Sequence, residues 1–248
     1  MSDQPDIPHN LITDVDVSVV IPVKAYSQRV HNKNWKYFYE DKCLLDIKIL
    51  QVMRVIPKNK IFIYSDTEKA LEIAAKYGVL GYIYGTTKLD WPETFYNIVM
   101  KVKSQYVMRA AVTTPFIGSS IIRDMIQTFI LNEKQYDSIV AVERIQSRIL
   151  DAKGQPYNFG EGIPFHQGGS KAHKQTQDLS PIFAEKPGVS MLPTETARKI
   201  KYGYGDRPYL FEIPALEIID INTPDDWEAA QLLLTSDVIK HYFNWDLG

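Results

Sequence analysis

A group of basic and polar side chains directly follows the first strongly apolar segment of the chain. That segment is the run VSVVIPV at residues 17–23, and the loop after it carries Lys24, Ser27, Arg29, His31, Lys33 and Asn34. Ligands of open parallel sheets bind outside the carboxyl ends of the strands, where this loop would lie. Its fixed positive charges suit a triphosphate, because they offset its charge and hold a leaving pyrophosphate. The loop is therefore a candidate phosphate site, with a merely solvated basic loop as the alternative.

Composition and missing motifs narrow the classes of function. The sequence has neither a glycine-rich dinucleotide pattern nor the P-loop pattern GxxxxGKS/T, which disfavours hydride transfer and P-loop kinase chemistry. A formal net charge of -2 predicts no nucleic-acid partner and no membrane partner. The single cysteine, Cys43, excludes a disulfide framework and a zinc site of several thiolates. With no apolar run near the roughly 20 residues of a membrane span, we expect a cytoplasmic protein.

Strands and helices alternate along the chain and must position this loop. Apolar runs predict strands at 17–23, 60–64, 79–84, 106–112, 138–142, 189–192 and 215–219. Periodic segments predict helices at 44–55, 68–77, 93–103, 119–131, 194–201 and from Thr223 onward. Ser65 with Glu68 fits a capping box, and Gly78 suits a left-handed helix end. The alternation predicts an α/β fold of three layers around a mostly parallel sheet.

Residues 143–186 interrupt this alternation. The stretch is rich in glycine and shows little periodicity. A long irregular excursion in a compact domain is usually functional, a lid, or an arm exchanged with a partner subunit. We therefore predict a single domain over residues 17–240 with an arm inserted at 143–186, flanked by a flexible tail at 1–16 and another at 241–248. The arm predicts a homodimer.

Five segments in a fixed order resemble the acylneuraminate cytidylyltransferase family. The first, residues 22–34, has the spacing of the family pattern P-A-R-x-x-S-K-R-x-x-x-K-N, and Ser27, Arg29, Lys33 and Asn34 match it. The other segments are residues 64–79, the turn TTP at 113–115, TQDLSPIF at 176–183 and IDINTPDDW at 219–227. The resemblance covers roughly residues 17–234 and implies a Rossmann-like nucleotidyltransferase fold.

The resemblance also implies a reaction and the residues that carry it. In this family an acceptor hydroxyl attacks the α-phosphorus of CTP, with Mg²⁺ and loss of pyrophosphate, and the acceptor is an acidic sugar such as a nonulosonic acid. Such transfer depends mostly on positioning and charge neutralisation. The expected catalytic residues are Lys24, Lys33 and Asp220. The expected nucleotide-binding residues are Pro22, Val23, Lys24, Ser27, Arg29, Lys33 and Asn34. Asp220 and Asn222 are the expected metal ligands, and the expected acceptor-binding residues are Thr113, Thr114, Gln177 and Asp178.

Several positions depart from the family pattern. Lys24 stands where the family has arginine, Gln28 where it has lysine, and Asn222 where it has a second metal aspartate. Thr176 replaces an arginine, and Ala111 with Val112 replaces a Gln-Pro pair. The changes at Thr176, Ala111 and Val112 fall on the acceptor side, and Lys24 and Asn222 concern the nucleotide and the metal, so two alternatives stay open. One is a cytidylyltransferase with another acceptor, such as another sugar or a metabolite bearing a phosphate or phosphonate. The other is a non-catalytic protein that binds a nucleotide.

Overall fold

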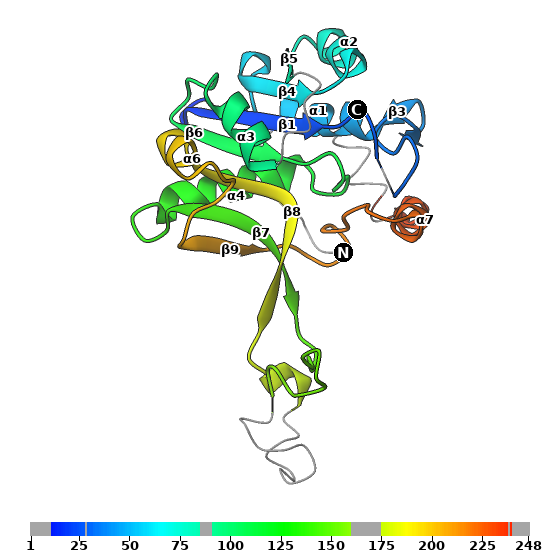
Figure 1. The fold of residues 1–248 in the computed structure, drawn as a ribbon, viewed down its shortest axis with the longest axis vertical. Coiled ribbons are helices and arrows are strands. Elements are labelled where there is room, and N and C mark those ends of the chain that lie inside the picture. Colours follow the sequence, from blue (N-terminus) through cyan, green and yellow to red (C-terminus); the bar gives the residue numbers. More distant parts are fainter. Residues whose placement is uncertain (1–10, 28, 85–90, 160–174, 238, 240–248) are drawn as a thin grey trace.

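The protein has a mixed α/β fold built on one large sheet, as seen in a computed structural model that describes residues 11–27, 29–84, 91–159, 175–237 and 239 (Figure 1). The sheet has seven strands in the order β5-β4-β1-β6-β8-β7-β9. These strands are β1 (Val17–Val23), β4 (Ile61–Ser65), β5 (Leu80–Ile83), β6 (Tyr106–Ala110), β7 (Ser138–Ile145), β8 (Ile182–Pro193) and β9 (Pro208–Glu212). Two short strands, β2 (Tyr37–Tyr39) and β3 (Lys42–Cys43), form a separate hairpin.

Most neighbouring strands of the large sheet are parallel. β1 pairs in parallel with β4 and β6, β4 with β5, and β7 with β9. Only β8 is antiparallel to its neighbours, β6 and β7. The mostly parallel sheet predicted from the sequence is therefore confirmed. Because β1 lies in the middle of the parallel part, the loop that follows it opens at the carboxyl edge of the sheet, where ligands of such folds bind.

Helices cover both faces of the sheet and bury two hydrophobic cores. The helices are α1 (Leu44–Met53), α2 (Glu68–Tyr77), α3 (Trp91–Val99), α4 (Ser119–Asn132), α6 (Thr194–Ile200) and α7 (Pro224–Leu233). Val19 and Ile21 of β1 pack into the core that includes residues of α1, α2 and α4, and Val20 packs into the core that includes α3 and α6. A strand covered on both faces is apolar along its whole length, which explains the run in β1. The three-layer prediction is confirmed.

The helix ends confirm the expected end at Gly78 and the expected start of the last helix at Thr223, and they correct one expected capping box. Gly78 ends α2 with a left-handed φ of 71°, and Thr223 begins α7 with its hydroxyl accepting from Asp226 N at 3.2 Å. The predicted capping box of Ser65 and Glu68 is wrong, because Ser65 is the last, fully buried residue of β4. Thr67 is the N-cap of α2 instead.

The predicted late strand at 215–219 is also wrong. Residues 215–217 form a turn, in which the amides of Glu217 and Ile218 donate to Pro214 O at 2.9 and 3.1 Å, and residues 218–219 are not in a strand. The last strand is β9, which the sequence did not predict. The apolar pattern was misleading because Ile218 enters the core from a turn, with 1% of its surface exposed.

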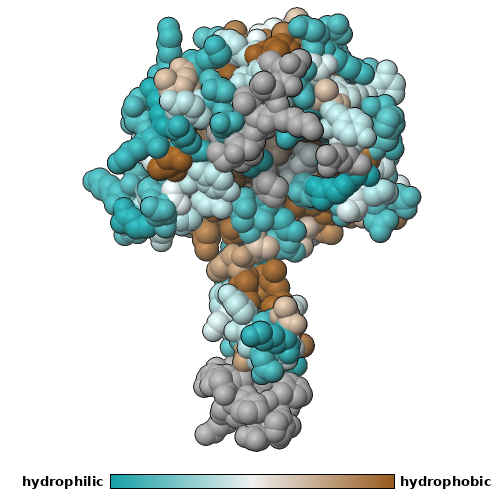
Figure 2. Space-filling view, in the orientation of Figure 1, coloured by the Kyte–Doolittle hydropathy of each residue, from teal (hydrophilic) through white to brown (hydrophobic). Residues whose placement is uncertain are grey.

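The predicted arm is regular at its two ends. β7 and β8 continue past the body as an antiparallel ribbon, with pairs from Glu143 and Ala184 out to Ile145 and Ile182, and this ribbon projects from the molecule (Figure 1). Farther out lie a bridge between Leu150 and Pro156 and a 3-10 turn, η2 (Thr176–Asp178). Apolar surface is visible on the ribbon next to the body (Figure 2). A dimer formed through this arm stays a prediction.

The part of the expected N-terminal tail that the structure describes packs against the body. Ile12 is buried, and its amide donates to Val55 O at 2.8 Å. Asp16 forms an ion pair with Lys60 at 2.8 Å and accepts from the amide of Gln105. Among the described residues, no helix combines the length and apolar character that crossing a membrane requires.

Candidate active site

The loop after β1 is folded back on itself by side-chain bonds to its backbone. Asn34 Nδ2 donates to Lys24 O at 2.9 Å, and Trp35 Nε1 donates to Ala25 O at 2.7 Å. The amide of Ala25 donates to Asp66 Oδ1 at 2.6 Å, which ties the loop to the end of β4. Lys24 itself is exposed. The bonds therefore fix the backbone beneath Lys24 while its ammonium extends into solvent.

The remaining predicted nucleotide residues lie close to Lys24 in the chain. Pro22 and Val23 are the last residues of β1 and pair with Tyr64 and Ser65 of β4. Ser27 is half-buried in the loop. Gln28, which departs from the family pattern, lies outside the described residues.

A segment from the other end of the chain meets this loop. Lys33 Nζ donates to Ile221 O at 2.5 Å, and Arg29 Nη2 donates to Asn222 Oδ1 at 2.7 Å. These two bonds join residues 188 and 193 positions apart in the sequence. The structure thus brings together the cations predicted after β1 and the carboxylate and amide predicted before α7.

Lys33 is a buried cation whose charge is partly balanced by this segment. Its relative exposure is 7%. Loss of solvation lowers the pKa of Lys33, and the negative charge of Asp220 opposes this change. The nearby positive charge of Arg29 lowers the pKa further, whereas the negative charge of Asp226 raises it. An ammonium has three donors, so the bond to Ile221 O leaves Lys33 able to donate to a phosphate as well.

Asp220 has the features expected of a metal ligand. Its Oδ2 accepts from Asn222 Nδ2 at 2.5 Å, whereas its Oδ1 is buried and has no hydrogen-bond partner in the described part of the chain. A buried acceptor without a donor is costly, and a hard cation would satisfy it. Asn222 Oδ1, by contrast, is already used by Arg29.

The described residues contain no cluster of three or more His, Cys, Asp or Glu side chains placed to hold a metal ion. A Mg²⁺ ion at Asp220 would therefore take its other ligands from substrate phosphates and water, which is how proteins often bind Mg²⁺. The residues present fit Mg²⁺ in this manner, with Asp220 as the protein carboxylate.

The predicted acceptor residues divide into two places. Thr113 follows β6 next to the metal candidate, since its carbonyl accepts from Ile221 N at 2.8 Å. Thr114 is fully buried, and its hydroxyl donates to Ala111 O at 3.2 Å. Gln177 and Asp178 are exposed in η2, far out on the arm, and the structure does not bring them to the loop after β1 of the same chain (Figure 1).

Arg109 is a charged residue near the site that the sequence reasoning missed. It lies on β6, in a stretch that was interpreted only as a buried strand. Burial lowers the pKa of Arg109, against the opposing negative charges of Glu185 and Asp220. Its side chain is nonetheless partly exposed. A single arginine within the apolar run VMRAAV was the feature that could have revealed it.

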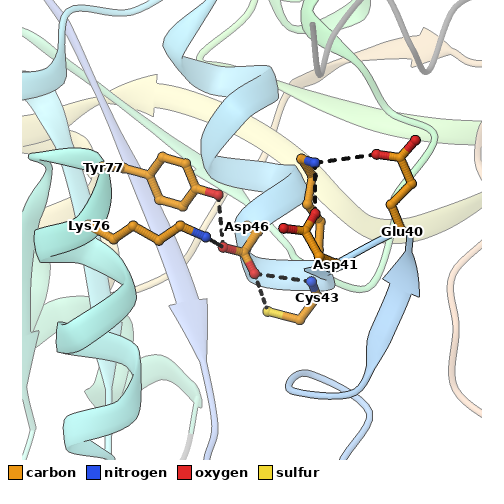
Figure 3. A network of polar contacts seen from close by, with 7 residues as sticks. Glu40, Asp41, Cys43, Asp46, Lys76 and Tyr77 are labelled. Carbon is orange, nitrogen blue, oxygen red and sulfur yellow. Dashed lines mark hydrogen bonds and ion pairs between the residues drawn. The ribbon is translucent and has the colours of Figure 1, made fainter.

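A buried carboxylate supports the helix that follows the loop. Asp46, near the start of α1, accepts from Cys43 N at 3.0 Å and Cys43 Sγ at 2.9 Å, and from Lys76 and Tyr77 of α2 at 3.1 and 2.8 Å (Figure 3). Burial, together with the Asp46 charge, raises the pKa of Cys43 to about 12. The thiol is therefore protonated at neutral pH and stabilises the start of α1.

Solved structures of three other proteins share this fold. CMP:2-keto-3-deoxy-manno-octonic acid synthetase complexed with CTP has a TM-score of 0.59 at 12% identity, over 89% of this chain and 98% of that chain. A 4-diphosphocytidyl-2C-methyl-D-erythritol synthase from Anaerococcus prevotii has a TM-score of 0.62 at 10% identity, over 90% and 97%. A cytidylyltransferase from Leptospira borgpetersenii has a TM-score of 0.58 at 14% identity, over 94% and 92%. At these identities the likeness shows the fold alone.

The family of this chain is shown by a match of its sequence to a family profile, and not by the structural neighbours. No curated protein matches the sequence closely enough to count as a relative. The profile of the family described as Cytidylyltransferase matches residues 18–158, which is more than half of the chain. The match begins in β1 and includes both the basic loop and the turn at Thr113. It agrees with the enzyme class predicted from the sequence, a CTP-dependent nucleotidyltransferase. The chain therefore belongs to the cytidylyltransferase family.

Proposed function

We propose that this protein transfers CMP from CTP to a hydroxyl group of an acidic sugar, such as a nonulosonic acid, with Mg²⁺ and release of pyrophosphate. A bond forms between the acceptor oxygen and the α-phosphorus, the bond from that phosphorus to the pyrophosphate oxygen breaks, and the hydroxyl proton passes to solvent. The observation that carries the proposal is the convergence of Lys33 and Arg29 on the segment of Asp220, at the carboxyl edge of the sheet.

The surroundings of each residue at this site support a particular role in the proposed reaction. Lys24 is exposed at the strand end, so its ammonium can contact the β- and γ-phosphates. Lys33 adds a second, fixed positive charge that offsets the charge on the leaving pyrophosphate. Asp220, whose Oδ1 is buried without a hydrogen-bond partner in the described part of the chain, would hold Mg²⁺, and the ion would supply charge neutralisation at the phosphates. Asn222 orients Asp220 and is itself held by Arg29.

Two kinds of evidence support an acidic sugar as the acceptor. Five segments of the sequence resemble the acylneuraminate cytidylyltransferases, in order and over nearly the whole chain. One structural neighbour is named as a synthetase of a CMP-activated octonic acid. Thr113, at the edge of the site, is the candidate acceptor contact in the same chain, and Thr114 supports its turn.

A second acceptor class has its own support. Ala111 and Val112 stand where the acylneuraminate family has a Gln-Pro pair, so the acceptor side of the site differs from that family. Another structural neighbour is named as a 4-diphosphocytidyl-2C-methyl-D-erythritol synthase, whose product is a diphosphate ester of a sugar alcohol. A phosphate-bearing sugar or sugar alcohol is therefore the alternative acceptor.

The outer arm gives a reason to propose a homodimer. Gln177 and Asp178 resemble acceptor-side residues but lie in η2, away from the loop after β1 of their own chain (Figure 1). If they contact the acceptor, they do so in the site of a second copy. We therefore include a homodimer, with the arm reaching the partner, in the proposed function.

The test is a pyrophosphate-release assay with CTP, Mg²⁺ and a panel of acceptors, together with calorimetry of CTP binding. The panel contains nonulosonic and octulosonic acids, neutral sugars, and sugar or sugar-alcohol phosphates. Lys24→Ala and Asp220→Asn should each lower kcat/KM by about 10²-fold or more, as lost charge stabilisation does. Lys58→Ala, an exposed lysine in the 3-10 turn η1 (Lys58–Lys60) before β4, is the matched control.

The outcomes separate the hypotheses. Turnover with acids alone supports the primary proposal, and turnover with phosphates alone supports the alternative. CTP binding with no turnover of any panel member supports a non-catalytic nucleotide-binding protein. If CTP does not bind, or if Lys24→Ala and Asp220→Asn keep full activity, the proposed site is wrong.

A further inference from the structure

Two polar side chains of α1 are completely buried and bind the backbone of another segment. Lys48 and Gln51 have no exposed surface. Lys48 Nζ donates to Thr114 O at 3.1 Å and to Ile117 O at 2.7 Å, and Gln51 Nε2 donates to Pro115 O at 2.7 Å. Burying an ammonium is costly, so these donors must satisfy groups that matter to the fold.

The segment that they hold is the turn between β6 and α4. Thr114, Pro115, Phe116 and Ile117 are all buried, so carbonyls in this turn need donors within the protein. The turn itself supplies two internal bonds, from Thr114 Oγ1 to Ala111 O at 3.2 Å and from Ile117 N to Thr114 O at 3.3 Å. Both are longer than the 2.7 Å bonds from Lys48 to Ile117 O and from Gln51 to Pro115 O, so these two side chains of α1 hold the turn in position.

The turn is connected directly to the candidate active site. Thr113 directly precedes the residues whose carbonyls are bound by Lys48 and Gln51. Thr113 O accepts from Ile221 N at 2.8 Å. Ile221 O in turn accepts from Lys33 Nζ at 2.5 Å. Ile221 lies between Asp220 and Asn222, so a shift of the turn moves the backbone that carries both side chains.

We propose that Lys48 and Gln51 are positioning residues for cytidylyl transfer. They fix the turn of residues 113–117, which fixes the backbone of Ile221 and thereby the Asp220 carboxylate and the Lys33 ammonium. This inference rests on the proposed function, because it takes Asp220 and Lys33 as residues of the site. Neither Lys48 nor Gln51 touches substrate, and their effect is carried by backbone bonds.

The test compares variants that remove these donors with a control that removes a similar bond elsewhere. Lys48→Met and Gln51→Met keep a long side chain with high helix propensity but lose the bonds to the turn. Thr194→Val is the control, because Thr194 is buried and its hydroxyl donates to Ser104 O at 2.7 Å, before the amino end of β6. Lys48→Arg, which keeps a cationic donor, is the conservative variant.

The expected result is a loss of kcat without a matching change in CTP affinity. A misplacement of about 1 Å in a site costs on the order of 10²-fold in rate, so Lys48→Met should lower kcat by roughly 10- to 100-fold. The Mg²⁺ concentration for half-maximal activity should rise several-fold, and KM for CTP should change by less than about threefold. Gln51→Met should act in the same direction but more weakly, Lys48→Arg should recover part of kcat, and Thr194→Val should leave these quantities unchanged.

Amide hydrogen exchange provides a readout that does not depend on turnover. In Lys48→Met the exchange of the Ile221 amide should accelerate, because its acceptor at Thr113 is released, and in Thr194→Val it should not. If the wild type shows neither turnover nor CTP binding, the proposed function fails, while the exchange result still decides the positioning role. Unchanged Ile221 exchange in both Lys48→Met and Gln51→Met, or equal kcat in these variants and the control, would overturn the inference. If Lys48→Met does not fold, the measurements on Gln51→Met alone decide whether the inference holds.

Discussion

Asn222→Asp is the substitution that best tests the electrostatics of the site. In the wild type Asn222 Nδ2 donates to Asp220 Oδ2 at 2.5 Å. Aspartate has almost the same shape but no donor, so two carboxylates would face each other across this contact. A hydrogen bond to a charged group contributes about 1.5–3 kcal/mol, and like-charge repulsion adds to the loss. The bond from Arg29 to the other oxygen is retained and offsets part of it.

The expected net loss in metal-free buffer is about 2–4 kcal/mol of unfolding free energy, or roughly 5–15 °C in Tm for a chain of this length. A cation between the carboxylates removes the repulsion. Saturating Mg²⁺ at about 100 times its dissociation constant stabilises a folded protein by about 2.7 kcal/mol. Mg²⁺ should therefore stabilise Asn222→Asp much more than the wild type, and should bring its Tm close to the wild-type value.

Thermal unfolding at neutral pH, with EDTA and with Mg²⁺, measures both the loss of stability and its recovery by the cation. Asn158→Asp on the arm is the control, since it also loses an amide donor, to Ser147 O at 2.9 Å. Equal Tm values for variant and wild type in EDTA, or equal stabilisation of both by Mg²⁺, would refute the reasoning.

Three further predictions address other parts of the molecule. Burial raises the pKa of the Cys43 thiol from 9.0 to about 12, so the thiol's contribution to stability is present below pH 9 and is lost as the pH rises toward 12. In urea titrations, the unfolding free energy of Cys43→Ser should therefore fall less than that of the wild type between pH 8 and 11. Lys33→Met should weaken CTP binding about tenfold or more in calorimetry, because it removes a charged phosphate contact, whereas unaltered affinity would place the phosphates elsewhere. Light scattering at micromolar concentration should show a dimer, and a monomer would contradict the role proposed for the arm.

The sequence was sufficient for much of the fold because the central strands are buried on both faces. Continuous apolar runs such as those of β1 and β4 follow from that burial, and they predicted the strands correctly. β9 was missed because it lies at the edge of the sheet, where its residues are half-buried or exposed and show no apolar run. The turn at 215–219 was mistaken for a strand for the opposite reason, since Ile218 is buried without being in a strand.

The composition of the site was more predictable than its contacts. Residue types and spacing placed cations after β1, and the family resemblance placed a carboxylate before α7. The structure brings the two together through Lys33 and Ile221. No local pattern could reveal that Ile221 O is the acceptor of Lys33, because the bond depends on the path of the whole chain. Buried Lys48 and partly exposed Arg109 were missed because both lie in segments whose apolar pattern indicated only core.

The long sequence separation within the site also has a consequence for how the protein is made. Two contacts, of Arg29 with Asn222 and of Lys33 with Ile221, depend on residues that follow Arg29 by more than 190 positions. Neither contact can form until these late residues have been synthesised and have emerged from the ribosome. Strands β1, β4 and β6 pair over shorter separations and can assemble earlier. A nascent chain would therefore hold Lys33 without its carbonyl partner for most of its synthesis. Nucleotide binding should appear as one of the last steps of folding, after the central sheet has formed.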